Sequence, residues 1–324
     1  MSLSDEVRQF LARQTLTVRG AVRGSAHGAH RTNLRARGRE FIDHRAYGPG
    51  DELREIDWRA TGRAARVMVR QTEAERHLSL LFVLDAGGSM RYGDGDQSRW
   101  HYTQQVVRAL AHLARHQADA IGVLAGLARG AEAVAVPPSA RWTSPARLEP
   151  ALAAVTPAGD CPWEALLSAI DPHITSRGVT LIISDFLDPR MSTGDGPVVA
   201  CRELFSRIGT LAARGQQVLA LQLLHRDEVA FPWTGAQQVS FRCARGRRAT
   251  VETDAAAART RYLEALQAYL VHMDAAAQAF DVPLVRSTTD APLIATLTSV
   301  LEALAQGHHL PPPPATLLHR EGVA

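Results

Sequence analysis

Four oxygen-bearing side chains in this 324-residue chain lie near the ends of apolar segments or in a Gly-containing loop. Asp85 and Ser89 follow one apolar run, Asp185 follows another, and Asp160 precedes a helical pattern. Carboxylate and hydroxyl oxygens suit a hard divalent ion such as Mg²⁺, which keeps several of its waters when bound. These four residues are therefore the candidate metal ligands.

Alternating strands and helices would position these side chains. Continuous apolar runs at 78–84 and 179–183 are typical of strands that are covered on both faces. Their alternation with helical patterns predicts an α/β fold with a doubly wound, mainly parallel sheet of the Rossmann type. Ligands of such sheets bind outside the carboxyl ends of the strands, so the acids are expected at one edge. The predicted strands are 78–84, 120–127, 131–136, 179–183, 217–223, 238–241, 249–252 and 283–285, and the predicted helices are 5–14, 104–116, 145–154, 162–170, 201–213, 255–280 and 292–304.

Composition divides the chain into three parts. Residues 1–77 are expected to form an N-terminal arm and a charged segment that pack on the main domain, as a small β or irregular extension. Within it, a short helix is predicted near 53–61 and a strand at 67–69. Residues 78–306 would form the α/β domain, and residues 307–324 a Pro-rich, extended tail.

Composition also narrows the class of protein. The chain has no apolar run near the roughly 18 residues that a membrane helix needs, and its N-terminus lacks the pattern of a signal peptide. A cytoplasmic protein without a membrane span is therefore expected. Its three cysteines are far apart and odd in number, which favours reduced thiols over a disulfide framework.

Arginine is concentrated near the N-terminus. Seven arginines lie between residues 19 and 45, against only Glu40 and Asp43. Such an arm could bind nucleic acid or another acidic partner. The alternative, which we favour, is that the arm docks on acidic groups of its own domain.

A dense polar block follows this arm and contains a Gly-Pro-Gly turn. Its aspartates could bind its arginines in two-pronged ion pairs, with Tyr47 and Trp58 closing over them. Asp57 could also accept backbone N–H groups. The alternative is that the arginines face outwards and bind an acidic partner. The residues of this expected structural clasp are Arg45, Tyr47, Asp51, Arg54, Asp57, Trp58 and Arg59.

The acidic residues resemble a known metal site. Their order is similar to the metal-ion-dependent adhesion site of von Willebrand factor A domains, Asp-x-Ser-x-Ser followed by Thr and then Asp. Asp85, Ser89 and Asp185 match that pattern. Gly87 takes the place of the first serine, and Asp160 takes the place of the threonine. The resemblance implies a von Willebrand factor A-like fold. It also implies a degenerate site for Mg²⁺ or another divalent cation, completed by a partner's carboxylate.

The polar block supports a more specific resemblance. Gly38-Arg39-Glu40-Phe41, followed by Arg45-x-Tyr47-x-x-Gly50-Asp51-x-x-Arg54-x-Ile56-Asp57-Trp58-Arg59, resembles the signature of the bacterial "domain of unknown function 58" family. The resemblance covers roughly residues 35–305 and points to a short type without N-terminal membrane helices. It implies no catalytic role. It implies instead a partnership with MoxR-type AAA+ ATPases, as an adaptor or chaperone partner in the assembly or maturation of protein complexes.

Other functions remain open at this point. A metal-dependent hydrolase, such as a phosphoesterase, could use Asp85, Asp160 and Asp185, although no nucleophile or base is recognisable. Nucleic-acid binding through the Arg-rich arm is a further alternative. The chain contains no lysine and so no P-loop, which means that it is not itself a P-loop ATPase. His225, at the end of a predicted strand, is expected to cap the backbone and not to bind a ligand.

Overall fold

The computed structural model describes residues 3–17, 40–47, 56–64, 66–73, 78–126, 134–139, 145–173, 178–187, 196–214, 216–233, 238–244 and 250–307. They form two compact units: the described residues between 40 and 73 make one, and the remaining described residues make the other. Most of the predicted Arg-rich arm and nearly all of the Pro-rich tail lie outside the described residues. Among the residues that are described, no helix is long and apolar enough to cross a membrane.

The larger unit is built on a six-stranded sheet with the order β10-β7-β6-β3-β4-β5. All neighbouring strands run parallel except β5, which pairs antiparallel with β4 at one edge. This order is that of a doubly wound sheet, so the predicted α/β fold is confirmed. The strands are β3 (Ser79–Asp85), β4 (Ala120–Gly126), β5 (Val134–Ser139), β6 (Gly178–Ser184), β7 (Gln216–Leu224) and β10 (Leu284–Thr288).

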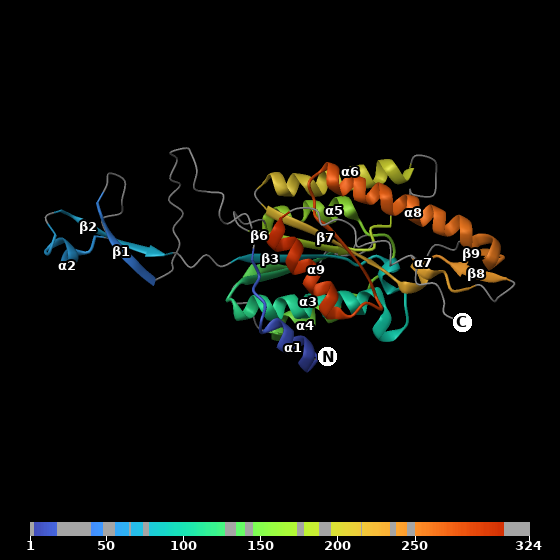
Figure 1. Cartoon of the computed structure of the whole chain (residues 1–324), viewed down its shortest axis with the longest axis horizontal. Coiled ribbons are helices and arrows are strands. Elements are labelled where there is room, and N and C mark those ends of the chain that lie inside the picture. Colours follow the sequence, from blue (N-terminus) through green and yellow to red (C-terminus); the bar gives the residue numbers. More distant parts are fainter. Residues whose placement is uncertain are drawn as a thin grey trace. The chain divides into compact units, whose positions relative to one another are not determined.

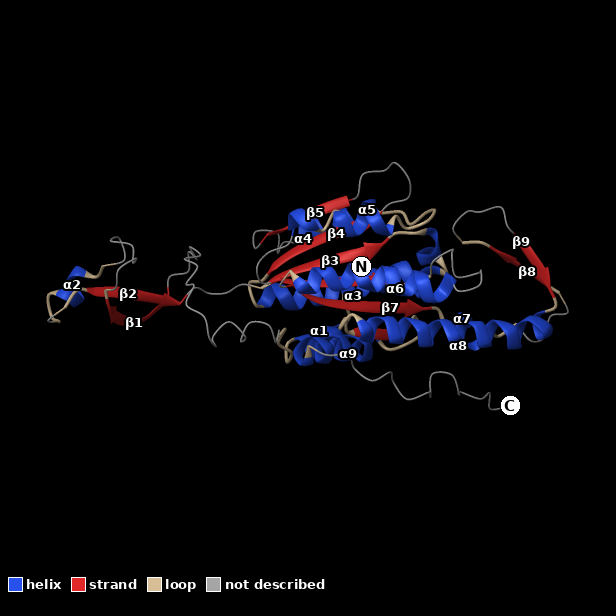
Figure 2. Ribbon diagram, turned by 90° about the horizontal axis from the view of Figure 1, so that it is seen from above, coloured by secondary structure: helices blue, strands red, loops and turns tan. Residues whose placement is uncertain are grey.

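Helices cover both faces of this sheet (Figures 1 and 2). Because side chains alternate along a strand, Leu80, Phe82 and Leu84 of β3 pack with the helices of one face, and Leu81 and Val83 with those of the other. All seven residues of β3 and of β6 are buried, as the continuous apolar runs predicted. The first face carries α1 (Asp5–Leu11), α3 (Arg99–His116), α4 (Pro145–Ala154) and α9 (Leu293–Gln306), and the second α5 (Trp163–Ser168), α6 (Gly196–Ala213) and α8 (Ala255–Ala279).

Two local differences from the predicted elements affect the site. Helix α3 begins at Arg99, five residues before the predicted start, because the Ser98 hydroxyl caps it by accepting the N–H of His101 at 3.2 Å. The predicted strands at 238–241 and 249–252 are present. Within the described part of the chain they pair with each other alone, as an antiparallel hairpin beside the N-terminal end of α8 (Figure 2). These strands are β8 (Val239–Arg242) and β9 (Thr250–Thr253), and the unpredicted helix before them is α7 (Arg226–Ala230).

The smaller unit contains an antiparallel strand pair and one helical turn. Strand β1 (Glu40–Ala46), which was not predicted, pairs with β2 (Met68–Glu73), which extends the predicted strand at 67–69. The predicted helix at 53–61 is limited to α2 (Trp58–Thr61). The Asp57 N–H donates to the Met68 carbonyl at 2.9 Å, and this bond ties the start of α2 to β2.

Candidate functional site

The switch point of the sheet lies between β3 and β6. From β3 the chain winds outward through α3 to β4, and from β6 it winds the other way through α6 to β7. The parallel register pairs Leu84 with Ile183, so the two strands end side by side. Asp85 is the last residue of β3 and Asp185 is the first after β6. Both acids therefore lie at the edge where doubly wound sheets bind ligands.

Asp85 is locked into the protein interior. It is only 1% exposed, and one carboxylate oxygen accepts the Gly87 N–H at 2.7 Å. The other accepts the hydroxyl of Ser184 at 2.6 Å. Burial raises the pKa of Asp85 and the nearby charge of Asp185 raises it further, against hydrogen bonds from Ser184, Gly87 and Cys161. The structure therefore favours the neutral form of this acid more than water does.

Asp185 is fully buried and forms an ion pair with Arg99, the first residue of α3. Its second carboxylate oxygen accepts the Leu187 N–H at 3.0 Å. The other terminal nitrogen of Arg99 binds Glu228 in α7. Burial opposes the charge of Arg99, but Glu228 and Asp185 outweigh burial and hold its pKa above the ordinary value. A buried guanidinium thus bridges two acids that lie far apart in the sequence.

A further layer holds the main chain at Asp185. Its carbonyl accepts the Gln222 amide at 3.1 Å and the Tyr269 hydroxyl at 3.4 Å. Gln222 in turn accepts a bond of 2.7 Å from Arg286, which is paired with Asp274 at 2.8 Å. Residues from β7, α8 and β10 therefore fix the position of Asp185.

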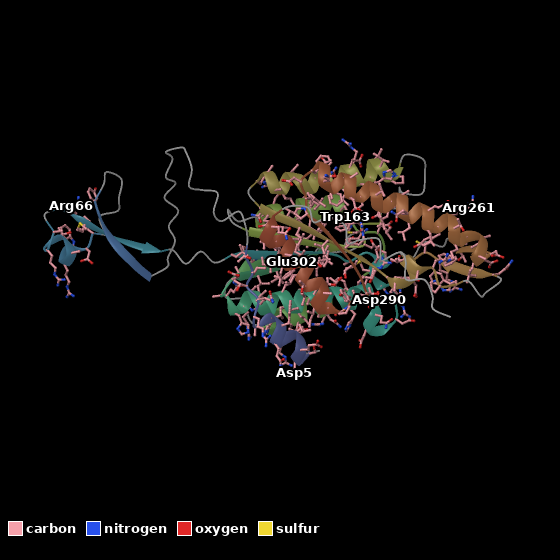
Figure 3. The ribbon with its side chains drawn as sticks, in the orientation of Figure 1. Asp5, Arg66, Trp163, Arg261, Asp290 and Glu302 are labelled. Atoms are coloured by element: carbon pink, nitrogen blue, oxygen red, sulfur yellow. The ribbon has the colours of Figure 1, made fainter. Side chains whose placement is uncertain are left out.

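Two phenylalanines beside this site have backbone conformations that bulky residues rarely adopt. Phe186 has a φ of 56° and Phe231, which follows α7, a φ of 45°. The ring of Phe186 stacks on Trp163 with centroids 5.6 Å apart (Trp163 is labelled in Figure 3). Left-handed conformations of this kind cost free energy and tend to cluster at functional sites.

The other two predicted ligands come from other segments than the ion pair of Asp185 with Arg99, although Ser89 and Arg99 line the same pocket. Ser89, in the 3₁₀-helix Gly88–Arg91, is 6% exposed, and its hydroxyl has no hydrogen-bond partner among the described residues. Asp160 is exposed, in a loop that two backbone hydrogen bonds of 2.9 and 2.8 Å join to the turn at 86–88. The structure thus brings the loop of Asp160 to the site while leaving its side chain at the surface.

Gly87 explains one departure from the adhesion-site pattern. A Cβ atom at this position would lie 2.9 Å from a carboxylate oxygen of Asp85 and 3.2 Å from the backbone nitrogen of Cys161. The serine of the pattern therefore has no room here unless one of the two loops shifts.

The arrangement does not fit a divalent cation. Within the described ranges, no three His, Cys, Asp or Glu side chains are grouped so that they could hold a metal ion. Every carboxylate oxygen of Asp85 and Asp185 already accepts a hydrogen bond. Arg99 also places a positive charge where a cation would have to bind. The Ser89 hydroxyl has no hydrogen-bond partner among the described residues and could coordinate a metal ion. Binding of Mg²⁺ remains a sequence prediction.

The predicted clasp falls in the smaller unit. Asp57 caps α2, and its carboxylate accepts the N–H groups of Arg59 and Ala60 at 3.0 Å each. Trp58 is 70% exposed and Tyr47 39% exposed. The expected clasp of arginines and aspartates stays a prediction. Asp51 and Arg54 lie outside the described residues, as does the side chain of Arg45.

Sequence reasoning missed Arg99 and Glu228. Arg99 is one of 36 basic residues and lies ahead of the predicted helix, and only the N-cap residue Ser98 signals where that helix begins. Glu228 belongs to a capping box with His225, whose ring accepts the Asp227 N–H at 3.2 Å. The predicted capping role of His225 is thus confirmed.

Comparisons with known proteins identify relatives of the chain. The family model described as "Protein of unknown function DUF58" matches residues 43–270. The uncharacterized proteins Rv1480 of Mycobacterium tuberculosis and Mb1516 of Mycobacterium bovis are each 30% identical to it over 224 residues. The alignment covers 68% of this chain and 66% of each relative.

Solved structures give more distant matches. The conserved hypothetical protein BatB from Bacteroides thetaiotaomicron is 13% identical, with a TM-score of 0.40 over 71% of this chain and 96% of that one. The VWA domain of SpRpn10 is 9% identical, with a TM-score of 0.40 over 68% of this chain and 94% of that one.

Proposed function

This chain belongs to the DUF58 family of proteins of unknown function, and on that premise we propose that its α/β unit is a non-catalytic protein-interaction module. Its partner would be a MoxR-type AAA+ ATPase or a client of that ATPase, and the chain would act as an adaptor in the assembly or maturation of protein complexes. The observation that carries the proposal is the state of the acids at the switch point. Asp85 and Asp185 are buried and bonded, and Arg99 balances the charge of Asp185.

This arrangement argues against hydrolysis. A phosphoesterase would need carboxylates that hold a metal or activate water, and such groups must reach the substrate. The carboxylates of Asp85 and Asp185 face Ser184 and Arg99, and Asp160 stands at the surface. We therefore assign the edge to binding and not to catalysis.

Direct binding to the ATPase tests the proposal. The chain would be immobilised, and the MoxR-type ATPase of the same genome would be titrated over it by biolayer interferometry, with ATP and with ADP. Saturable binding is expected, while bovine serum albumin at the same concentrations gives no signal. An ATPase that fails to bind in either nucleotide state would contradict the assigned partner.

A turnover assay on the same protein preparation tests the alternative that the chain is a metal-dependent hydrolase. p-Nitrophenyl phosphate and its diester would be incubated with the chain in Mn²⁺, with Asp85→Asn as the matched variant. No turnover above buffer is expected. Turnover that Asp85→Asn abolishes would replace the binding module with an enzyme.

Calorimetric titration tests the cation. We expect no heat of binding with Mg²⁺ or Mn²⁺, because Arg99 already supplies the positive charge beside Asp185. Saturable heat that disappears in Asp85→Ala would instead support the divalent-cation site predicted from the sequence.

A further inference from the structure

An aromatic pocket opens beside the Arg99 ion pair. Its volume is about 480 Å³, within the range of pockets that bind ligands or single anchoring side chains. We call it the aromatic pocket. Its walls come from the turn after β3, the end of α7, the β8–β9 hairpin and the first turns of α8, and its ring and aliphatic lining residues are Tyr92, Leu187, Phe231, Trp233, Phe241, Val251, Ala258 and Tyr262.

Phe231 is the centre of the aromatic wall. Its ring lies 5.0 Å from Trp233, 5.8 Å from Phe241 and 5.1 Å from Tyr262, measured between centroids. Its left-handed backbone, with a φ of 45°, directs the chain out of α7 and into the segment that carries Trp233. The wall is thus assembled around a residue that is held in a costly conformation.

The floor of the pocket carries unused hydrogen-bonding groups. Ser89 and Arg99 both line it and are 6% and 1% exposed. The Ser89 hydroxyl and the Arg99 Nε–H have no hydrogen-bond partner among the residues that the structure describes. Buried polar groups rarely stay unpaired, because leaving them so costs free energy. Two donors that line the same cavity can be satisfied from outside the chain, by water or by an acceptor of a bound ligand that displaces it.

Local charge determines what kind of acceptor fits. The single positive charge of Arg99 contacts two acids, Asp185 and Glu228, so the floor has no net positive charge to attract an anion. A partner's carboxylate, the group that would complete a metal site, would be repelled. A neutral carbonyl can accept both hydrogen bonds without this repulsion.

We propose that the aromatic pocket anchors a segment of the protein partner. The segment would insert one aromatic or large aliphatic side chain against Phe231, Trp233 and Tyr262, while a main-chain carbonyl accepts hydrogen bonds from Ser89 and Arg99. Anchors of this kind, with large side chains in desolvated pockets, dominate many interfaces. This inference rests on the proposed function and gives the partner's chemistry: a neutral, apolar peptide segment.

A small probe tests the pocket without the partner. N-acetyl-phenylalaninamide has a ring and neutral carbonyls, and ligand-observed NMR should give a Kd on the order of 1 mM for a ligand of this size. N-acetyl-alaninamide lacks the ring, and N-acetyl-phenylalanine carries a carboxylate. Both should bind more weakly. Equal binding of the alanine amide or of the carboxylate would overturn the assigned chemistry.

Two variants on α8 locate the probe. Ala258→Trp fills the aromatic pocket from its wall and should abolish binding of N-acetyl-phenylalaninamide. Ala257→Trp places the same ring on the exposed neighbour, which does not line the pocket, and should leave binding unchanged. Thermal melting of both variants checks that they fold. Folded Ala258→Trp that still binds the probe would overturn the location.

Ser89→Ala tests the floor. We expect probe affinity to fall about fivefold, as for the loss of one hydrogen bond. The melting temperature should not fall, because the hydroxyl has no partner to lose within the described protein. Unchanged affinity would remove Ser89 from the site.

Binding of the whole ATPase to the Ala258→Trp variant tests this inference separately from the proposed function. Ala258→Trp should weaken ATPase binding at least about thirtyfold, since hot-spot residues contribute about 2 kcal/mol or more and each 1.4 kcal/mol is about tenfold. If the probe is lost while ATPase binding is unchanged, the pocket does not anchor the partner, although the interaction module stands. If the probe binds as described but no ATPase does, the partner assignment fails while the pocket chemistry stands.

Discussion

At the scale of single residues, the buried guanidinium of Arg99 is the central charged group at the switch point. Arg99 connects Asp185 after β6 to Glu228 in α7 and also lines the aromatic pocket. In a metal-dependent adhesion site a cation would lie near these acids, and here an arginine side chain supplies the positive charge. Arg99 thus supplies a positive charge beside Asp185 and Glu228, and its Nε–H and the Ser89 hydroxyl are left for the pocket.

Removing this charge should be costly. Arg99→Met would leave Asp185 and Glu228 buried without a counter-charge, and we expect the free energy of unfolding to fall by about 3–5 kcal/mol. Urea denaturation followed by circular dichroism measures the loss. The control is Arg108→Met on the same helix, which removes a more exposed pair with Glu149 and should cost about 1 kcal/mol or less. Equal losses in the two variants would contradict the central role of Arg99.

His225 should make stability depend on pH. Burial lowers the pKa of its imidazole below the ordinary 6.5, and the neutral ring accepts the N–H of Asp227. Below pH 6.5 the unfolded chain therefore binds more protons than the folded one, so the free energy of unfolding falls as the pH falls. His225→Asn keeps a capping oxygen and removes the titration.

Urea denaturation at several pH values between about 7.5 and 5.5 checks this sign. The wild-type protein should lose more stability across that window than His225→Asn does. Parallel curves for the two proteins would show that His225 does not contribute.

At the scale of elements, two loops pack directly on each other at the carboxyl end of β3. The turn at 86–88 and the loop at 158–161 share two backbone hydrogen bonds, and Gly87 faces the backbone nitrogen of Cys161. This close approach holds the Gly87 N–H against Asp85 and leaves no room for a side chain.

Gly87→Ala should therefore destabilise the larger unit. Its Cβ would lie 2.9 Å from the Asp85 carboxylate and 3.2 Å from backbone, and relief of such overlap costs about 1–3 kcal/mol. The denaturation midpoint in urea measures the effect. Gly87→Ser, which restores the adhesion-site pattern, should destabilise similarly and give no heat with Mg²⁺. Stability equal to the wild type would mean that the loops separate easily.

At the scale of the whole molecule, the N-terminal helix belongs to the α/β unit and not to the charged segment that follows it. Val7 and Leu11 are buried in the core with residues of α3 and α9. The segment predicted as 1–77 is thus divided between two compact units, with its first helix packed on the larger one.

Truncation of this helix's buried face tests its contribution. Leu11→Ala should lower the free energy of unfolding of the larger unit by about 2–5 kcal/mol, because a buried leucine leaves a cavity. The exposed Gln9→Ala on the same helix should stay within about 0.5 kcal/mol of the wild type. If Leu11→Ala leaves the main unfolding transition unchanged, α1 unfolds independently of the rest of the larger unit.

The sequence by itself determined the fold class, the family and the strand ends that carry Asp85 and Asp185. These features follow from local patterns in the sequence: runs of apolar residues as long as a strand, apolar residues at helical spacing, and a continuous polar signature. Strand β1 and the short helix α7 were not predicted, because neither segment has a clear hydrophobic period. The predicted start of α3 lay too far along the chain, because the capped first turn of this helix precedes its apolar face.

Only the tertiary structure decided what the acids do. Arg99 reaches Asp185 across 86 residues and Glu228 across 129, and no local pattern distinguishes this arginine from the others. The fit of Gly87 against Cys161 and the aromatic pocket formed by α7, α8 and the β8–β9 hairpin likewise depend on segments far apart in the chain. Local periodicity specifies which elements form. The pairing of charges and the filling of space at the switch point depend on how those elements pack.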